Sequence, residues 1–140
     1  HFTINLKGSL LAAQAVLPLM RARKSGSIVF FSSTLARSGG VNSAAYSATK
    51  GGILGLMRSM ALDVAGDNVR VNSVSPGIAD TAMPRANMDE ASLAARAASN
   101  PMGRIGAPID MAEAAVFLLD AENSFMTGQD IRVTGGALLF

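Results

Sequence analysis

Residues 27–55 read SIVFFSSTLARSGGVNSAAYSATKGGILG and predict a strand, a loop and the first half of a helix. The short apolar run at residues 27–33, rich in Ile, Val and Phe, is typical of a strand covered on both faces, as in a parallel sheet. From Ala44 to Ala65 apolar residues recur at helical spacing, and the Gly-Asp-Asn triplet that follows provides a stop. A buried strand followed by a loop and a long helix favours an α/β fold.

The flanking segments continue this alternation. Residues 2–26 predict an amphipathic helix that stops at Ser25-Gly26, and residues 69–75 predict a second strand that ends at Pro76-Gly77. A further helix begins at Pro108 and a third strand covers residues 129–134. Strands that alternate with helices indicate βαβ units and a parallel sheet.

Residues 78–106 form the longest stretch without a strong pattern. They are punctuated by two prolines and two glycines, and only one short helix is predicted there, near Glu90–Ala98. A long excursion between regular elements is more often a functional lid than a passive connection. We therefore expect residues 78–106 to cover a substrate site.

Composition limits the class of protein. The 140 residues suit one domain or a piece of one. Hydrophobic residues make up 49% and charged residues 16% of the chain, against about 25% charged in ordinary domains, which disfavours disorder and leaves apolar surface for partner subunits. No apolar run reaches the ~18 residues of a membrane span, so we expect a soluble, cytoplasmic protein.

Several kinds of site are not expected. The net charge is +2 and the basic residues are scattered, which gives no case for nucleic acid binding. Cysteine is absent and His1 is the one histidine. Disulfides, thiol catalysis and zinc-thiolate sites are therefore excluded, and no metal site is predicted.

Catalytic residue types concentrate between Ser33 and Lys50. Lys50 follows Tyr46 by four residues in a predicted helix, so the two side chains share one face. An ammonium near a phenol favours the phenolate, which allows proton exchange nearer neutral pH. Ser33 ends the preceding strand, and ligands of open α/β sheets bind at the carboxyl ends of strands. Ser33 and the first turn of the next helix can therefore face one crevice.

The stretch SSTLARSGGVNSAAYSATKGGILG resembles the active-site signature of the short-chain dehydrogenase/reductases, with Ser33, Tyr46 and Lys50 in register. The segment NLKG from Asn5 is similar to the family segment that carries a fourth catalytic residue, an Asn. The segment VRVNSVSPGIADTAM is similar to the one after the family's sixth strand, and GR-x-G, FL and TGQDIRV-x-GG are similar to its C-terminal part. The resemblance implies the C-terminal part of a Rossmann-type, doubly wound parallel sheet, with residues 1–140 as a partial oxidoreductase domain. It also implies NAD or NADP as cofactor, an alcohol or ketone substrate and a homodimer or homotetramer.

The resemblance also implies individual roles. Tyr46 would be the general acid and base, Lys50 would hold the nicotinamide ribose, Ser33 would hydrogen-bond the reacting oxygen and Asn5 would position a water in a proton relay to Lys50. The residues implied to contact the cofactor are Tyr46, Lys50, Pro76, Gly77, Ile78 and Thr81.

Plainer interpretations stay open for these residues. Tyr46 and Lys50 fit a solvated helix surface, Ser32 could replace Ser33, and Asn5 could be a helix N-cap. Gly77 fits an ordinary turn after Pro76. Elsewhere in the chain, Gly51 and Gly52 are expected to permit the close approach of a neighbouring helix.

The chain also departs from the family pattern. It contains no G-x-x-x-G-x-G loop after a first strand, which in the family holds the cofactor pyrophosphate, and it begins with His1, so we expect it to begin inside a longer protein. Thr134 stands where the family usually has Asp, a position expected away from the chemistry. The main functional alternative is a catalytically inactive assembly or binding module of the same fold, and a generic flavodoxin-like binding domain is a weaker one.

Overall fold

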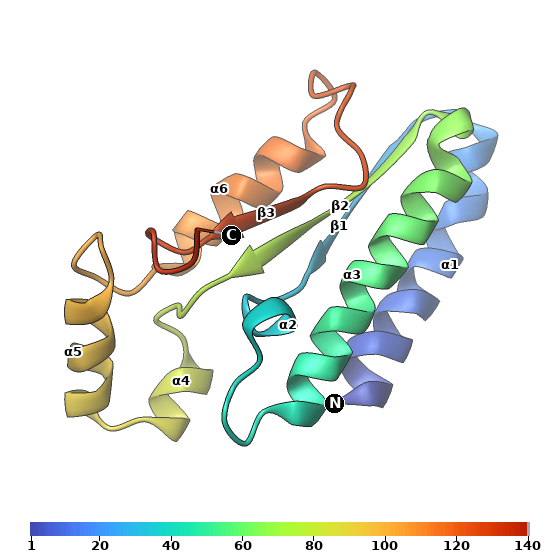
Figure 1. Cartoon of the computed structure of the whole chain (residues 1–140). Helices are drawn as coiled ribbons and strands as arrows, with labels where there is room; N and C mark the ends of the chain where they lie inside the picture. The colour runs from blue at the N-terminus through green and yellow to red at the C-terminus, as the bar shows by residue number, and fades with distance from the viewer. Residues whose placement is uncertain (140) are drawn as a thin grey trace.

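The sheet is parallel and central, as Figure 1 shows for a computed structural model that describes residues 1–139. Its strands are β1 (Gly26–Phe31), β2 (Val69–Pro76) and β3 (Asp130–Val133), in the order β1-β2-β3. Helices α1 (Gly8–Ala22) and α3 (Ala44–Val64) lie on one face and α6 (Pro108–Leu119) on the other. The predicted α/β fold class is confirmed.

Residues 1–139 also contain five shorter elements. They are the π-helix η1 (Phe2–Lys7), α2 (Leu35–Ser38), the 3-10 helix η2 (Ala65–Asp67), α4 (Ala82–Asn87) and α5 (Glu90–Ser99). Figure 1 places α4 and α5 beyond the carboxyl end of β2, and α2 between the sheet and the start of α3.

Both faces of β2 are covered, and its side chains alternate between them. Val69 and Val71 pack in the core with α1 and α3. Arg70 points to the opposite face, where its guanidinium donates to the carbonyls of Leu118 and Asp120, at 2.8 Å each, at the end of α6. A cation at a helix C-terminus satisfies carbonyls that have no partner within the helix.

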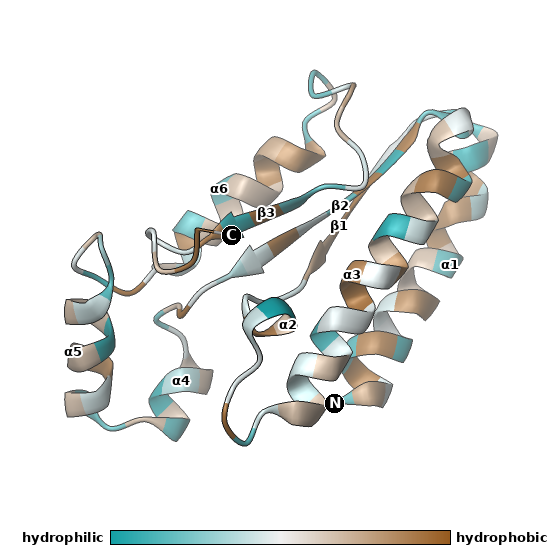
Figure 2. Ribbon diagram, in the orientation of Figure 1, coloured by the Kyte–Doolittle hydropathy of each residue, from teal (hydrophilic) through white to brown (hydrophobic). Residues whose placement is uncertain are grey.

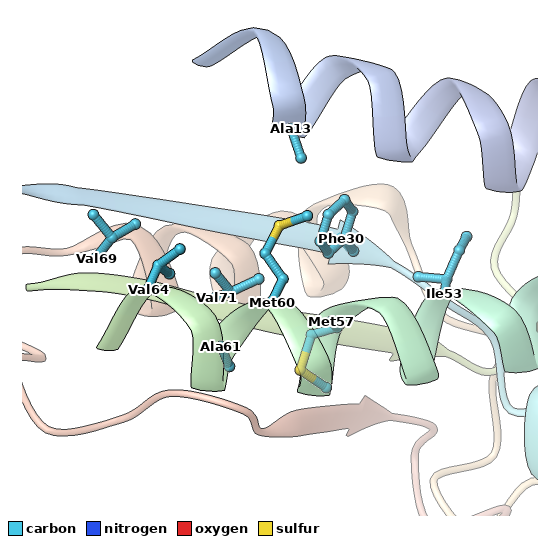
Figure 3. Packing of buried hydrophobic residues seen from close by; sticks show 9 residues of the cluster. All are labelled: Ala13, Phe30, Ile53, Met57, Met60, Ala61, Val64, Val69 and Val71. Carbon is cyan, nitrogen blue, oxygen red and sulfur yellow. The ribbon is translucent and has the colours of Figure 1, made fainter. Parts of the chain in front are cut away.

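The main core lies between α1, α3 and the sheet. Figure 3 shows Met57, Ala61 and Val64 of α3 facing the strands, and these side chains are nearly or fully buried, as their helical spacing predicts. Figure 2 shows hydrophobic residues, in brown, along α1, α3 and the strands. The first helix contributes residues at the same spacing: Leu6, Leu10, Ala13, Leu17 and Met20.

Gly52 permits a close approach of η1 to α3. A Cβ at this position would lie 2.9 Å from Cδ2 of Leu6, closer than side-chain carbons pack. The predicted role of Gly52 in helix packing is confirmed. Gly51 faces α2 instead, where a Cβ would be in ordinary contact with the Ala36 carbonyl oxygen, at 3.7 Å.

Two short helices were not predicted. Helix α2 has four residues, a single turn, which is too short for periodicity to reveal, and residues 35–43 were expected to form only a loop. Helix α4 contains Pro84 within its first turn, where the missing N–H has no partner to lose. The helix predicted near Glu90–Ala98 is confirmed as α5, but the prediction that it is the one helix in residues 78–106 is wrong, because α4 also forms there.

In the part of the chain that the structure describes, no helix combines the length and apolarity needed to cross a bilayer.

The free side of β1 leads to a prediction about association. Within residues 1–139, β1 pairs with β2 alone, so one row of its backbone donors and acceptors is open beside apolar side chains. Unprotected strand edges of this kind pair with other chains. Expressed on its own, the 140-residue chain should therefore form oligomers or aggregates, as measured by chromatography with light scattering. A stable monomer at tens of micromolar would contradict this expectation.

Candidate active site

Ser33 is held by an extension of the strand pairing. Beyond the end of β1, the Ser32 amide donates to the Val74 carbonyl at 2.8 Å and the Thr34 amide donates to the Pro76 carbonyl at 3.1 Å. Ser33 therefore lies beside the turn that follows β2, at the carboxyl edge of the sheet. This is the edge at which ligands bind in open α/β sheets.

Gly77 stands where two strand ends converge. Its amide donates to the Val133 carbonyl at 2.9 Å, and a Cβ added to it would lie 3.3 Å from Cα of Thr134. A larger residue would push the end of β3 away. Gly77 therefore allows the chain segment after β2 to pack closely against the end of β3, in addition to forming a turn.

A cavity of about 900 Å³ opens at this edge of the sheet. It gathers every residue predicted for the site except Asn5: its lining includes Ser33, Tyr46, Lys50, Pro76, Gly77, Ile78 and Thr81. Thr134 also lines it. Thr134, expected away from the chemistry, therefore lies in the wall of the candidate site, because β3 ends at the same edge as β2.

Tyr46 and Lys50 share one face of the first turns of α3, as their spacing predicts. The Lys50 Nζ lies 5.7 Å from the centre of the Tyr46 ring and donates to the Phe31 carbonyl at 2.8 Å. Burial lowers the pKa of the Lys50 ammonium from its ordinary value, because desolvation disfavours the charged form. An ammonium has three N–H groups, so two remain for other partners.

The hydroxyls of Ser32 and Ser33 have different surroundings. Both residues are buried and both line the cavity, but their hydrogen bonds differ. The Ser32 Oγ donates to the Lys50 carbonyl at 2.9 Å, which ties α3 to the end of β1. The Ser33 Oγ accepts from the Leu35 amide at 3.2 Å. Because that bond uses a lone pair, the Ser33 hydroxyl proton is still available to a ligand in the cavity. The geometry favours Ser33 over Ser32 as the hydrogen-bond donor to a substrate.

Asn5 does not line the cavity but contacts the first turns of α3. It lies inside η1, and its Nδ2 donates to Thr49 Oγ1 at 3.4 Å, while the Thr49 hydroxyl donates to the Tyr46 carbonyl at 2.7 Å. The alternative that Asn5 caps a helix is wrong, because its side chain reaches across to α3. Irregular π-helical turns occur often at functional sites. A sequence pattern for an ordinary helix cannot reveal such a turn.

The excursion at residues 78–106 forms one wall of the cavity. It contributes Met83, Pro84, Asn87, Met88 and Arg96 to the lining. Its two ends are fastened together, because the Gly106 amide donates to the Ile78 carbonyl at 3.0 Å and the Asp80 amide donates to the Gly106 carbonyl at 2.7 Å. The base of the excursion is therefore fixed to the sheet, and its action as a lid stays a prediction.

A carboxylate near that base supports the start of α6. Asp110 accepts from the Arg104 guanidinium at 2.6 Å and from the Ala107 amide at 2.6 Å. The hydrogen bond from Arg104, together with that from Ala107, lowers the pKa of Asp110 to about 2. The Gly-Arg-x-Gly segment thus joins the cavity wall to α6.

His1 was not predicted to contact the site. Its ring meets the Tyr46 ring edge-on, with the centroids 5.7 Å apart and an interplanar angle of 77°. Figure 1 shows the N-terminus beside the start of α3, which explains the contact. The sequence spacing between the two residues carries no signal of it.

Comparison with known proteins identifies relatives over nearly the full length of this chain. Residues 1–137 match a family described as enoyl-(acyl carrier protein) reductase. The chain is 36% identical to 3-oxoacyl-(acyl-carrier-protein) reductase FabG of Thermotoga maritima, over 97% of this chain and 55% of that protein. It is 42% identical to inactive 2-(S)-hydroxypropyl-CoM dehydrogenase 2 of Xanthobacter autotrophicus, over 95% of this chain and 60% of that protein.

Solved structures show the same similarity. A 3-oxoacyl-(acyl-carrier protein) reductase with bound NAD from Brucella melitensis aligns with a TM-score of 0.87 and 31% identity, over 99% of this chain and 51% of that one. ElxO with bound NADP aligns with a TM-score of 0.87 and 30% identity, over 94% of this chain and 54% of that one. The chain spans about half the length of the relatives it matches.

The two neighbouring serines provide a matched test of the site. Ser32→Ala removes a buried hydrogen bond and should lower the free energy of unfolding by about 1 kcal/mol. Ser33→Ala removes the free hydroxyl from the cavity and should change that free energy less. If Ser33 bonds the reacting oxygen, its loss should lower turnover on a ketone by ~10²-fold. Urea unfolding and steady-state kinetics separate the two effects, and a larger loss of turnover in Ser32→Ala would contradict the assignment.

Proposed function

This chain belongs to the short-chain dehydrogenase/reductase family, and we propose that the protein containing it interconverts a secondary alcohol and a ketone with NAD or NADP as cofactor. The single observation that most supports this proposal is the joint presence of Ser33, Tyr46 and Lys50 in the lining of one large cavity at the carboxyl edge of a parallel sheet.

The residues present fit a nicotinamide nucleotide. The Lys50 ammonium has N–H groups free for ribose hydroxyls, since only one is used by the Phe31 carbonyl. Thr81 offers a hydroxyl in the same cavity, and Gly77 has no side chain there to occupy it. When bound, the nicotinamide supplies the hydride carrier that no protein side chain can provide.

In the direction of reduction, Tyr46 donates its phenolic proton to the substrate oxygen. The Ser33 hydroxyl donates a hydrogen bond to the same oxygen without transferring its proton. This hydrogen bond orients the carbonyl and stabilises the charge that develops on the oxygen. Lys50 places a positive charge 5.7 Å from the centre of the Tyr46 ring, where it attracts the negative charge left on the ring once the proton has gone. In the direction of oxidation the roles are reversed, and the Tyr46 phenolate accepts the proton.

We propose that Asn5 positions a water molecule in a proton relay to Lys50. Its contact with Thr49, the residue before Lys50, supports this assignment, because Thr49 is itself bonded to the Tyr46 carbonyl. The relay water is part of the proposal. Replacing Asn5 would therefore disturb both the relay and the first turns of α3.

The cavity walls suit a substrate with an apolar body. Met83 and Met88 of the excursion line the cavity together with Leu35 and Leu138. Methionine side chains adapt to irregular apolar shapes. We assign residues 78–106 as the substrate lid, which would exclude water from the reacting carbon.

A catalytically inactive module of the same fold is the second candidate. It is favoured by one observation, that a relative with 42% identity bears the name of an inactive dehydrogenase. Turnover of a ketone by the protein containing this chain would exclude it. The predictions of a cytoplasmic location and of no nucleic acid or membrane partner remain predictions.

Tyr46→Phe tests the proposed proton transfer. The substitution keeps the ring and deletes the hydroxyl, so turnover should fall at least the ~10²-fold that a lost general acid costs, while cofactor affinity persists. Steady-state rates with NADH and NADPH and cofactor fluorescence titration measure the two quantities. Turnover equal to wild type would remove the assignment of Tyr46.

Lys50→Ala should behave differently from Tyr46→Phe. It removes the proposed ribose contact as well as the positive charge beside the phenol, so both the cofactor affinity and turnover should fall. The same titration provides the check. An unchanged cofactor dissociation constant in Lys50→Ala would count against the ribose contact.

We further propose that α1 and α3 form the interface of a homodimer or homotetramer. Leu11 and Leu19 of α1 are exposed, and Gly55 of α3 has open space where a Cβ would point. Gly55→Gln should therefore leave the fold intact and weaken association, which light scattering measures. Gly66→Gln is the matched control, because Gly66 is also open but lies beyond the end of α3. Equal association in Gly55→Gln and the control would contradict the proposed interface.

A further inference from the structure

An almost fully buried carboxylate, that of Asp130, lies in the sheet outside the lining of the cavity. Asp130 begins β3, and its side chain is 3% exposed. Its Oδ1 accepts from the hydroxyls of Ser73 and Ser75, at 2.7 Å each. Its Oδ2 accepts from the Arg37 guanidinium of α2 at 3.3 Å. These contacts join β2, β3 and α2 through a single side chain.

This polar group replaces the apolar packing expected for a covered sheet. Ser73 and Ser75 are fully buried in β2, on the same face as Val69 and Val71, and Ser73 is the direct cross-strand partner of Asp130. Burying hydroxyls and a carboxylate is unfavourable unless each finds a partner. Here the two hydroxyls and the cation all converge on the carboxylate, so the group forms a satisfied network.

The network ends on a helix that is too short to be stable alone. Helix α2 has one turn, and a single helical turn gains too few hydrogen bonds to offset its ordering. Its first amides are bonded to Ser33: the Leu35 amide donates to Ser33 Oγ at 3.2 Å and the Ala36 amide donates to the Ser33 carbonyl at 3.0 Å. The placement of α2 and the orientation of the Ser33 hydroxyl are therefore coupled.

We infer that Asp130 and Arg37 are positioning residues, which anchor α2 to the sheet and thereby hold the Ser33 hydroxyl with its proton directed into the cavity. This inference rests on the proposed function. Arg37 has a 39% exposed side chain, and pairs between exposed charges contribute little. In this pair, however, one partner is the buried Asp130 carboxylate. Arg37 is the cation that lies against this carboxylate when α2 is in place.

Arg37→Gln tests the inference in the active protein that contains this chain. With ethyl acetoacetate as a ketone probe and NADH or NADPH, kcat should fall about tenfold, since Ser33 loses its fixed orientation while Tyr46 stays in place. The cofactor dissociation constant should stay within twofold of wild type. Arg37→Lys retains the charge and should restore most of the lost kcat.

A matched control separates this effect from the general loss of an ion pair. Arg21 pairs with Asp67 at 2.6 Å, and its side chain is also partly exposed, at 53%, but this pair joins α1 to η2 and does not involve α2. Arg21→Gln should leave kcat unchanged. An equal loss of kcat in Arg21→Gln and Arg37→Gln would overturn the inference, as would wild-type kcat in Arg37→Gln.

A double-substitution experiment shows whether Arg37 acts through Ser33. In a Ser33→Ala background the hydroxyl is already gone, so adding Arg37→Gln should lower kcat no further, a nonadditivity typical of residues that act as a unit. A merely structural role of Arg37 would instead give the same tenfold loss in both backgrounds. That additive result would overturn the inference.

Amide hydrogen exchange provides a readout that does not depend on activity. Arg37→Gln should speed exchange in the peptide covering residues 34–40, whereas Arg21→Gln should not. Unchanged exchange in Arg37→Gln would overturn the anchoring of α2. If Tyr46→Phe keeps full turnover, the proposed function fails, and the exchange experiment still decides separately whether Arg37 and Asp130 anchor α2.

Discussion

The parallel pairing of β1 with β2 is the constraint on which the site depends. The register joins Phe31 to Val74, and the pairing continues past the strand ends through the amides of Ser32 and Thr34. This continuation places Ser33 beside the turn at Pro76-Gly77. A slip of the register would turn the buried side chains of β2 to the wrong face and move Ser33 away from Gly77.

Helix α3 converts that strand arrangement into a site. Its middle and end, from Met57 to Val64, pack on the sheet and fix the position of the helix. Its first turns place Tyr46 and Lys50 at the cavity, held by the bond from Ser32 to the Lys50 carbonyl and by the bond from Lys50 to the Phe31 carbonyl. The second half of α3 thus stabilises the fold, and its first turns supply the side chains proposed for the chemistry.

Sequence patterns predicted the parts of this architecture that repeat. The covered strands, the long helix α3 and the apolar positions of the first helix follow from periodicity, and the spacing of Tyr46 and Lys50 places them on one face. Helix α2 was not predicted because a single turn is too short for periodicity to reveal. Helix α4 was not predicted because it contains Pro84, and proline in a sequence usually indicates a break. The contact of Asn5 with Thr49 and that of Asp130 with Arg37 join residues far apart in the chain, which no local pattern reveals.

A structure of the protein containing this chain, with NADP or NAD and a ketone analogue bound, tests the central claim most directly. The account predicts that the carbonyl oxygen of the analogue lies within hydrogen-bond distance of both the Tyr46 hydroxyl and Ser33 Oγ, and that Lys50 Nζ contacts the nicotinamide ribose. An analogue bound away from Ser33 and Tyr46, or a nicotinamide outside the cavity at the ends of β1 and β2, would contradict it.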